Sequence, residues 1–177
     1  MPQSLSQFWG LLAFFGIAGL LIHSLWQAAQ KRPNAVDLEP AGVGGVLLIA
    51  GACMFLGGLY DAAAAALAWQ NVQAAASQPT REAFLASAVI NAAASLLFFA
   101  GSLRLFLGRS PSVRAQTAAV LVLAGPTAEA LGAAVAGMTL TADGAAWFAG
   151  LCAATLWGVW ACAFSARARH TYGVGQR

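Results

Sequence analysis

Five long apolar segments, almost free of charge, constrain this chain more than any other feature of its sequence. A helix needs about 20 predominantly apolar residues to cross the hydrocarbon core of a bilayer. Backbone polar groups in lipid must be satisfied within their own segment, so each stretch is expected to be a helix rather than an isolated strand. The sequence predicts transmembrane helices at approximately 8–28, 43–64, 84–106, 113–135 and 145–166.

The composition supports the same class of protein. Apolar residues make up 60% of the 177 positions and charged residues 8%, whereas a soluble domain carries about 25% charged residues. Too few charges are present to cover a soluble surface, so the apolar surplus must face lipid. The basic residues are few and lie beside apolar segments, which is typical of topology signals and not of nucleic-acid binding. We expect one all-α polytopic membrane domain over residues 1–177, with lipid and other membrane subunits as partners.

The positive charges predict the orientation of this bundle. Five crossings place eight of the nine basic residues on one face, and only Arg81 falls on the other. Because loops rich in lysine and arginine stay in the cytoplasm, the N-terminus is expected outside and the C-terminus in the cytoplasm of a bacterial inner membrane. The eight residues are Lys31, Arg32, Arg104, Arg109, Arg114, Arg167, Arg169 and Arg177.

Local signals place some helix ends and one helix pair. Pro79 is expected to precede the third helix, Ser110 to cap the fourth, and Thr141 to cap the fifth with Asp143 in its first turn. Small residues let membrane helices approach closely. Because glycines recur along the second and fourth segments, the sequence predicts that these two helices form the central pair.

Three polar side chains are expected at membrane depth. Asp61, Asn91 and Glu129 each fall in the half of a helix that this topology places toward the outside. Ionisable groups at such depth are functional candidates by default, so together they form a candidate proton or cation site. Pro126 is expected to kink the fourth helix and act as a hinge beside Glu129. The alternative is that these side chains are hydrated near the interface and only bond between helices.

No catalytic or metal motif accompanies these residues. The sequence has no HExxH, GxSxG or P-loop pattern, so we expect neither an enzyme nor a cofactor. The three cysteines lack the spacing of a metal site and are interpreted as small apolar packing residues. His23 is a weak candidate for an axial ligand to haem or another pigment, the alternative being a histidine that bonds between helices.

Two motifs resemble an uncharacterised bacterial membrane-protein family, domain of unknown function 2569. Gly42-Val43-Gly44-Gly45-Val46-Leu47 is similar to the GxGGWL opening of the family's first helix, with valine in place of tryptophan. The segment from Ser165 to Tyr172, SARARHTY, resembles the family ending S-x-R-V-x-x-T-F. Over residues 42–172 the resemblance implies a four-helix core, to which the first helix would be an addition. It implies no known activity.

The C-terminal motif has a physical interpretation of its own. Arg167 and Arg169 follow a helix end, where cations oppose the negative end of the helix dipole and meet anionic headgroups. Thr171 and Tyr172 are expected to fold back against the inner surface. The segment is therefore either a cytoplasmic anchor or a docking motif for a partner.

Two functions remain open from the sequence. The first is an accessory or structural subunit of a larger membrane complex, acting by helix packing and by contacts with lipid or partners. The second is a small transporter or ion-coupled carrier that uses the polar cluster.

Overall fold

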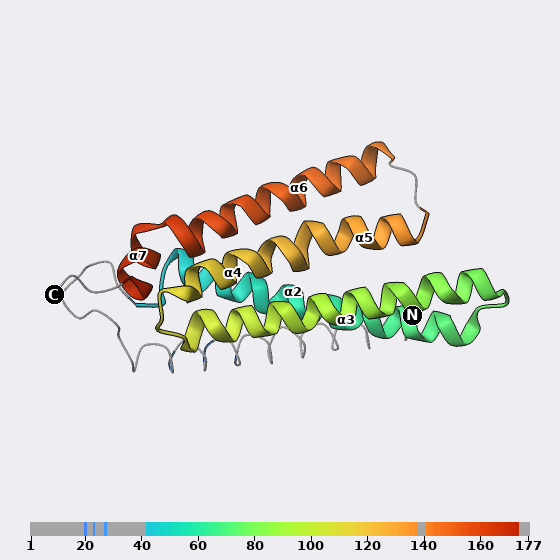
Figure 1. Cartoon of the computed structure of the whole chain (residues 1–177), viewed down its shortest axis with the longest axis horizontal. Helices are drawn as coiled ribbons and strands as arrows, with labels where there is room; N and C mark the ends of the chain where they lie inside the picture. Colours follow the sequence, from blue (N-terminus) through green and yellow to red (C-terminus); the bar gives the residue numbers. More distant parts are fainter. Residues whose placement is uncertain (1–19, 21–22, 24–26, 28–41, 138–140, 174–177) are drawn as a thin grey trace, which may run out of the picture.

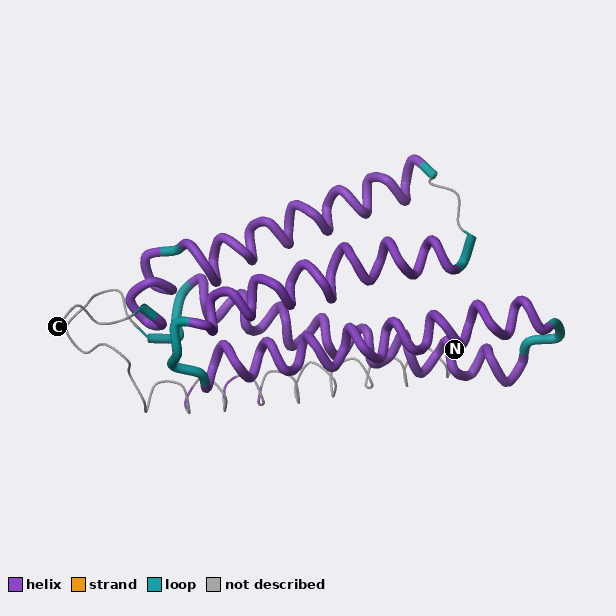
Figure 2. Tube along the Cα trace, viewed as in Figure 1, coloured by secondary structure: helices purple, strands orange, loops and turns teal. Residues whose placement is uncertain are grey.

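The computed structural model describes Leu20, His23, Gln27 and residues 42–137 and 141–173. These ranges contain helices and no strand (Figures 1 and 2). The first two long helices are α2 (Val46–Ala74) and α3 (Gln78–Leu107). The remaining elements are α4 (Ser112–Val122), η1 (Leu123–Thr127), α5 (Ala128–Val135), α6 (Ala142–Val159), η2 (Trp160–Phe164) and α7 (Ala166–Tyr172).

Four helices in these ranges are long and apolar enough to cross a membrane: Val46–Ala74, Gln78–Leu107, Ser112–Val135 and Ala142–Phe164. Large apolar side chains on their outer faces are exposed, among them Leu96, Leu131 and Leu156. Such an all-helical bundle with an apolar exterior is what a membrane protein requires. The predicted first helix, 8–28, lies outside the described residues except at three positions.

The connection between α2 and α3 is much shorter than the sequence suggested. Helix α2 continues to Ala74 and α3 begins at Gln78, so both helices extend beyond the predicted membrane segments, which ended near residue 64 and resumed near residue 84. Alanine favours helix in the intervening stretch. Pro79 does not precede α3 but lies in its first turn, where a missing N–H costs no hydrogen bond.

Of the two predicted helix caps, the one at Thr141 is present and the one at Ser110 is absent. The Thr141 hydroxyl accepts a hydrogen bond from the Gly144 amide, and Asp143 lies in the first turn of α6, as predicted. The predicted cap at Ser110 was wrong, since α4 begins after Pro111 without a side-chain cap. Instead, the carbonyl of Ser110 accepts a bond from the Val113 amide.

The central helix pair also differs from the prediction. The second helix packs chiefly along α3, not along the fourth. A methyl group added at Gly51 would lie 2.7 Å from the Phe106 ring, and one at Gly57 would lie 3.3 Å from Phe98. The short turn makes α2 and α3 antiparallel neighbours, and aromatic rings of α3 fill the spaces beside the glycines of α2. By contrast, Gly132 and Gly137 have nothing within 4 Å of such a methyl group.

Two buried serines join the same helices. Ser102 Oγ donates a 3.0 Å hydrogen bond to the carbonyl of Gly51, and Ser95 Oγ donates a 2.8 Å bond to that of Gly58. Interhelical bonds of this kind contribute about 0.6 kcal/mol each on average in membranes. They fix the register in which α3 lies against α2.

The bundle is tightly packed at one end and open at the other. The core cluster includes Leu47, Phe106, Val113, Cys162 and Tyr172, and all five are fully buried near the start of α2, the end of α3 and α7. Toward the opposite end, α5 and α6 diverge from α2 and α3 (Figure 1). No residue of α5 is buried.

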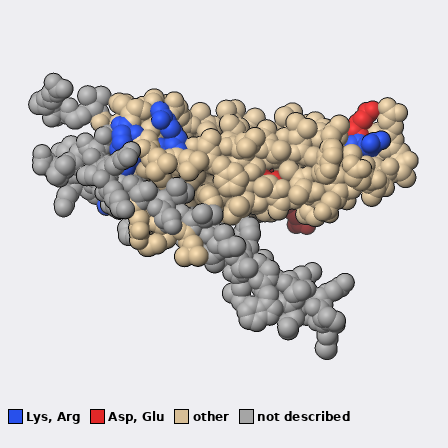
Figure 3. Space-filling model, turned by 90° about the horizontal axis from the view of Figure 1, so that it is seen from below, with Lys and Arg blue, Asp and Glu red and all other residues tan. Residues whose placement is uncertain are grey.

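Charge is divided between the same two ends. Arginines of the described residues gather at the packed end, with one further arginine at the open end beside an acidic residue (Figure 3). The gathered residues are Arg104, Arg109, Arg114, Arg167 and Arg169, and the separate one is Arg81. We call the two ends the arginine end and the open end.

Candidate functional site

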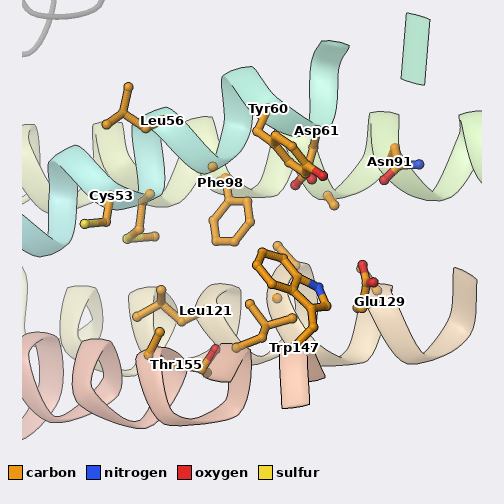
Figure 4. Close-up of a pocket in the computed structure, with 18 residues that line it drawn as sticks. Cys53, Leu56, Tyr60, Asp61, Asn91, Phe98, Leu121, Glu129, Trp147 and Thr155 are labelled. Atoms are coloured by element: carbon orange, nitrogen blue, oxygen red, sulfur yellow. The ribbon is translucent and has the colours of Figure 1, made fainter. Parts of the chain in front are cut away.

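A pocket of about 340 Å³ lies where the bundle begins to open (Figure 4). All four long helices contribute to it, and its walls are mainly apolar. A mostly apolar pocket with a few convergent polar groups is the usual form of a small-molecule site. The lining residues are Cys53, Met54, Leu56, Gly57, Tyr60, Asp61, Asn91, Ala94, Phe98, Leu121, Ala124, Gly125, Ala128, Glu129, Trp147, Leu151, Ala154 and Thr155.

The structure brings the three predicted polar residues together in this pocket. Asp61 comes from α2, Asn91 from α3 and Glu129 from α5. Figure 4 shows the carboxylates of Asp61 and Glu129 on opposite walls, both directed into the space between the helices. The negative charge of Glu129 acts electrostatically on Asp61.

The hydrogen bonds of the three side chains leave acceptor atoms available. Asp61 Oδ2 is buried and has no hydrogen-bond partner among the described residues. The Asn91 amide nitrogen donates to Ser87 within α3, at 2.9 Å to its carbonyl and 3.3 Å to its hydroxyl. The Asn91 amide oxygen is therefore left as an acceptor. This end of the pocket presents two carboxylates and an amide oxygen, and no lysine or arginine lines it.

The helix that carries Glu129 is broken beside the pocket. Gly125 has non-helical torsions, φ −85° and ψ −108°, directly before Pro126, so η1 (Leu123–Thr127) is a kink between α4 and α5. Proline cannot donate a backbone hydrogen bond, and sharp kinks in helices commonly occur at proline. The break lies within about one turn of Glu129, so it sets the direction from which that carboxylate enters the pocket.

Sequence reasoning missed the two aromatic residues of the pocket. Tyr60 and Trp147 lie on opposite walls near the carboxylates (Figure 4). They are 68% and 61% exposed, so they form an open rim rather than part of the core. Trp147 belongs to no motif in the sequence. The residues that lie across the pocket from Trp147 depend on how α6 packs. No local signal in the sequence encodes that packing.

At the arginine end, the C-terminal motif forms the short helix α7 and packs under the start of α2. Ser165 caps α7 by accepting a 3.1 Å bond from the Ala168 amide. The Arg167 guanidinium lies beside Gly44, where an added methyl group would be 3.1 Å from Nη1. Thr171 Oγ1 donates a 3.2 Å bond to the carbonyl of Gly42. The two segments that carry the family resemblance are thus in direct contact.

Tyr172 completes this contact. The side chain is fully buried, and its hydroxyl donates a hydrogen bond to the carbonyl of Leu105. Burial raises the pKa of the Tyr172 phenol, against the opposing effect of the nearby positive charge of Arg109. The side chains of Thr171 and Tyr172 are buried against other parts of the chain, whereas the side chain of Arg169 is exposed. We call Gly42–Gly45 together with Ser165–Tyr172 the clasp.

A π-helical segment adjoins the clasp. The residues Trp160–Phe164 are wound as η2, and the carbonyl of Ala163 accepts a 2.8 Å bond from Arg114 Nε and a second bond from the same guanidinium. Arg114, counted in the sequence as a topology signal, therefore also joins α4 to η2.

His23 is not among the residues that line the pocket. Its side chain is exposed, and its Nε2 is 2.8 Å from Gln27 Nε2 one helical turn later. Among the described residues no three histidine, cysteine or acidic side chains form a metal-binding group. A pigment at His23 stays a prediction.

Comparisons with known proteins identified no relative. Neither a family model, nor a curated protein, nor a solved structure matches this chain. The resemblance to domain of unknown function 2569 therefore stays a prediction that rests on its motifs.

Proposed function

We propose that this protein is a small carrier of the bacterial inner membrane that binds a cationic species in the pocket of Asp61, Asn91 and Glu129. The observation that carries the proposal is the convergence of two carboxylates and an amide oxygen from three helices in one pocket. Ionisable side chains inside a membrane are costly and typically mark ion or substrate paths. A cation or proton would supply the positive charge that the lining of this pocket lacks.

The proposed topology has five spans, with the N-terminus outside and the arginine end in the cytoplasm. At about 1.5 Å per residue, Asp61 lies roughly 22 Å along α2 from Val46. Since the hydrocarbon core is about 30 Å thick, this depth corresponds to the outer half of the bilayer. The gathering of Arg104, Arg109, Arg114, Arg167 and Arg169 supports the orientation, because positive residues are retained on the cytoplasmic side.

The broken helix supports movement around the pocket. Discontinuous helices commonly form the binding sites of membrane transporters. Here the break at Gly125 and Pro126 separates α4, which packs against the core, from α5, which has no buried residue. A shift of α5 about Pro126 would move Glu129 relative to Asp61 while the arginine end stays packed.

Flux measurements in liposomes test the proposal. Proteoliposomes should show uptake of protons or of a monovalent cation above that of empty vesicles, and Glu129→Gln or Asp61→Asn should abolish it. The matched control is Glu82→Gln, because Glu82 is exposed near the start of α3 and bonds only to Gln78 within that helix. An unchanged flux in both pocket variants would remove these carboxylates from the mechanism.

A second candidate is an accessory subunit of a larger membrane complex, favoured by a surface of small residues without a neighbour. Gly132 and Gly150 have open space around them, and small residues permit close approach of a further helix. Extraction in a mild detergent should then recover the protein with larger subunits in a fixed ratio. Recovery solely as a free monomer would contradict this candidate.

A further inference from the structure

We propose that the ligand of the pocket is a lipophilic organic cation, with its charge between Asp61 and Glu129 and its apolar body against Met54, Phe98 and Leu121. This inference rests on the proposed function and goes beyond it by naming a ligand class. It excludes a bare metal ion as the preferred occupant. Four features of the pocket carry it.

The first feature is charge. Asp61 and Glu129 project into one pocket, and the charge of Glu129 acts on Asp61. Like charges in a low-dielectric site repel each other, so the carboxylates gain most from an occupant that brings positive charge. The pocket is lined by no lysine or arginine that could serve this purpose. The arginines of the described residues belong to the two ends of the bundle.

The second feature is hydrogen bonding. Asp61 Oδ2 is a buried acceptor without a partner in the described residues, and an unsatisfied buried acceptor costs about 1–3 kcal/mol. Asn91 uses its amide nitrogen within α3, so it offers only an oxygen to the pocket. A positive charge placed beside these oxygens stabilises them electrostatically, as a hydrogen-bond donor would, whereas an anion or a pure acceptor does not.

The third feature is the pair of aromatic side chains. Tyr60 and Trp147 line the same end of the pocket as the carboxylates, on opposite walls (Figure 4). Organic cations bind to the faces of aromatic rings, and tryptophan is the strongest of these partners. A strongly hydrated metal ion gains little from such rings and would seek more oxygen ligands than the pocket offers.

The fourth feature is the apolar remainder of the pocket. Beyond the polar end the walls are formed by residues such as Met54, Phe98, Leu121 and Leu151. A volume of about 340 Å³ is within the range of pockets that hold a compact organic molecule. The exposed rim of Tyr60 and Trp147 opens toward the face that lipid would cover. A lipophilic ligand would therefore reach the pocket from the bilayer.

Three ions of matched structure test this inference with the full-length protein in nanodiscs. Tetraphenylphosphonium combines an apolar body with positive charge, tetraphenylborate has the same body with negative charge, and tetramethylammonium has the charge without the large body. Equilibrium binding of radiolabelled tetraphenylphosphonium should saturate at one site per chain. Tetraphenylborate should not displace it, and tetramethylammonium should bind at least about tenfold more weakly, because it buries far less apolar surface.

Variants locate the site. Asp61→Asn and Glu129→Gln should each weaken tetraphenylphosphonium binding about tenfold or more, while Glu82→Gln should leave it unchanged. Because changes at membrane depth can disturb folding, Trp147→Leu provides a variant that keeps both carboxylates. It should weaken binding about threefold or more, whereas Trp69→Leu, outside the pocket, should not.

The outcomes separate this inference from the carrier proposal. Equal binding of tetraphenylphosphonium and tetraphenylborate, or full binding in both carboxylate variants, would overturn the inference. Proton or metal-ion flux without tetraphenylphosphonium binding would also overturn it and would leave the carrier proposal standing. Saturable binding that depends on Asp61 and Trp147, without any flux, would support the inference and contradict the carrier proposal.

Discussion

The Thr171 hydroxyl donates a 3.2 Å hydrogen bond to the carbonyl of Gly42, joining positions 129 residues apart in sequence. The bond closes the clasp, in which the backbone before α2 packs against α7. Gly42 and Gly45 have positive φ values of 81° and 52° there, a conformation that glycine adopts without strain. Gly44, between them, leaves room for the Arg167 guanidinium.

Removing the closing bond should loosen the clasp. Thr171→Val keeps the branched shape of the side chain and loses the donor to Gly42, so we expect a loss of about 0.5–1.5 kcal/mol in stability. Thermal unfolding in detergent micelles measures the change. Thr80→Val is the control, because Thr80 is exposed and its hydroxyl contacts only Ser77. Equal effects of the two substitutions would contradict the structural role of the clasp.

Tyr172 should make the stability of the protein depend on alkaline pH. Burial raises the pKa of its phenol above the ordinary value, so the folded state retains the proton where the unfolded chain releases it. The stabilisation is complete below about pH 10 and is lost as the pH rises above that value, with a slope approaching about 1.4 kcal/mol per pH unit. Thermal unfolding between about pH 8 and 11, on either side of the ordinary phenol pKa, measures this slope.

The Tyr172→Phe variant isolates this contribution. Below the ordinary phenol pKa the variant should be less stable than the wild-type protein, because the bond to Leu105 is lost. Above about pH 10 its stability should fall less steeply. Tyr60→Phe should keep the steeper wild-type slope, since Tyr172 is intact. Parallel pH profiles for Tyr172→Phe and the wild-type protein would rule out Tyr172 as the source.

Two glycines on different helices should respond in opposite ways to the same substitution. Gly51→Ala places a methyl group 2.7 Å from the buried Phe106 ring, and such overpacking costs about 1–3 kcal/mol. Gly132→Ala meets nothing within 4 Å, and alanine favours helix over glycine by up to about 1 kcal/mol. Unfolding in detergent should therefore show a loss for the first and no loss for the second.

Cysteine labelling tests the orientation. In a background of Cys53→Ser, Cys152→Ser and Cys162→Ala, a membrane-impermeant maleimide should label Ser77→Cys in intact cells, because Ser77 is exposed in the turn between α2 and α3 and this turn is expected outside. Ser112→Cys, exposed at the start of α4, should be labelled only after lysis. The reverse pattern would invert the topology, and labelling of both in intact cells would refute the span count.

Several features follow from the sequence alone. Long apolar stretches without charge dictated membrane-length helices, because only a helix satisfies the backbone hydrogen bonds of a segment within that segment in lipid. The similar depth of Asp61, Asn91 and Glu129 also followed from counting residues along each helix, since an α-helix rises by a fixed amount per residue. The cap at Thr141 was predictable because a helix N-terminus needs an acceptor within a few residues.

Only the tertiary structure decided which faces meet. The sequence placed glycines on two helices, but those of α2 contact aromatic rings of α3 while Gly132 contacts none, because a stripe of small residues does not specify its partner. Likewise, depth put three polar residues at one level, and helix rotation determined that they share a pocket with Tyr60 and Trp147. The rotation of each helix and the pairing of helices depend on packing between segments far apart in the chain. Local sequence patterns do not specify that packing.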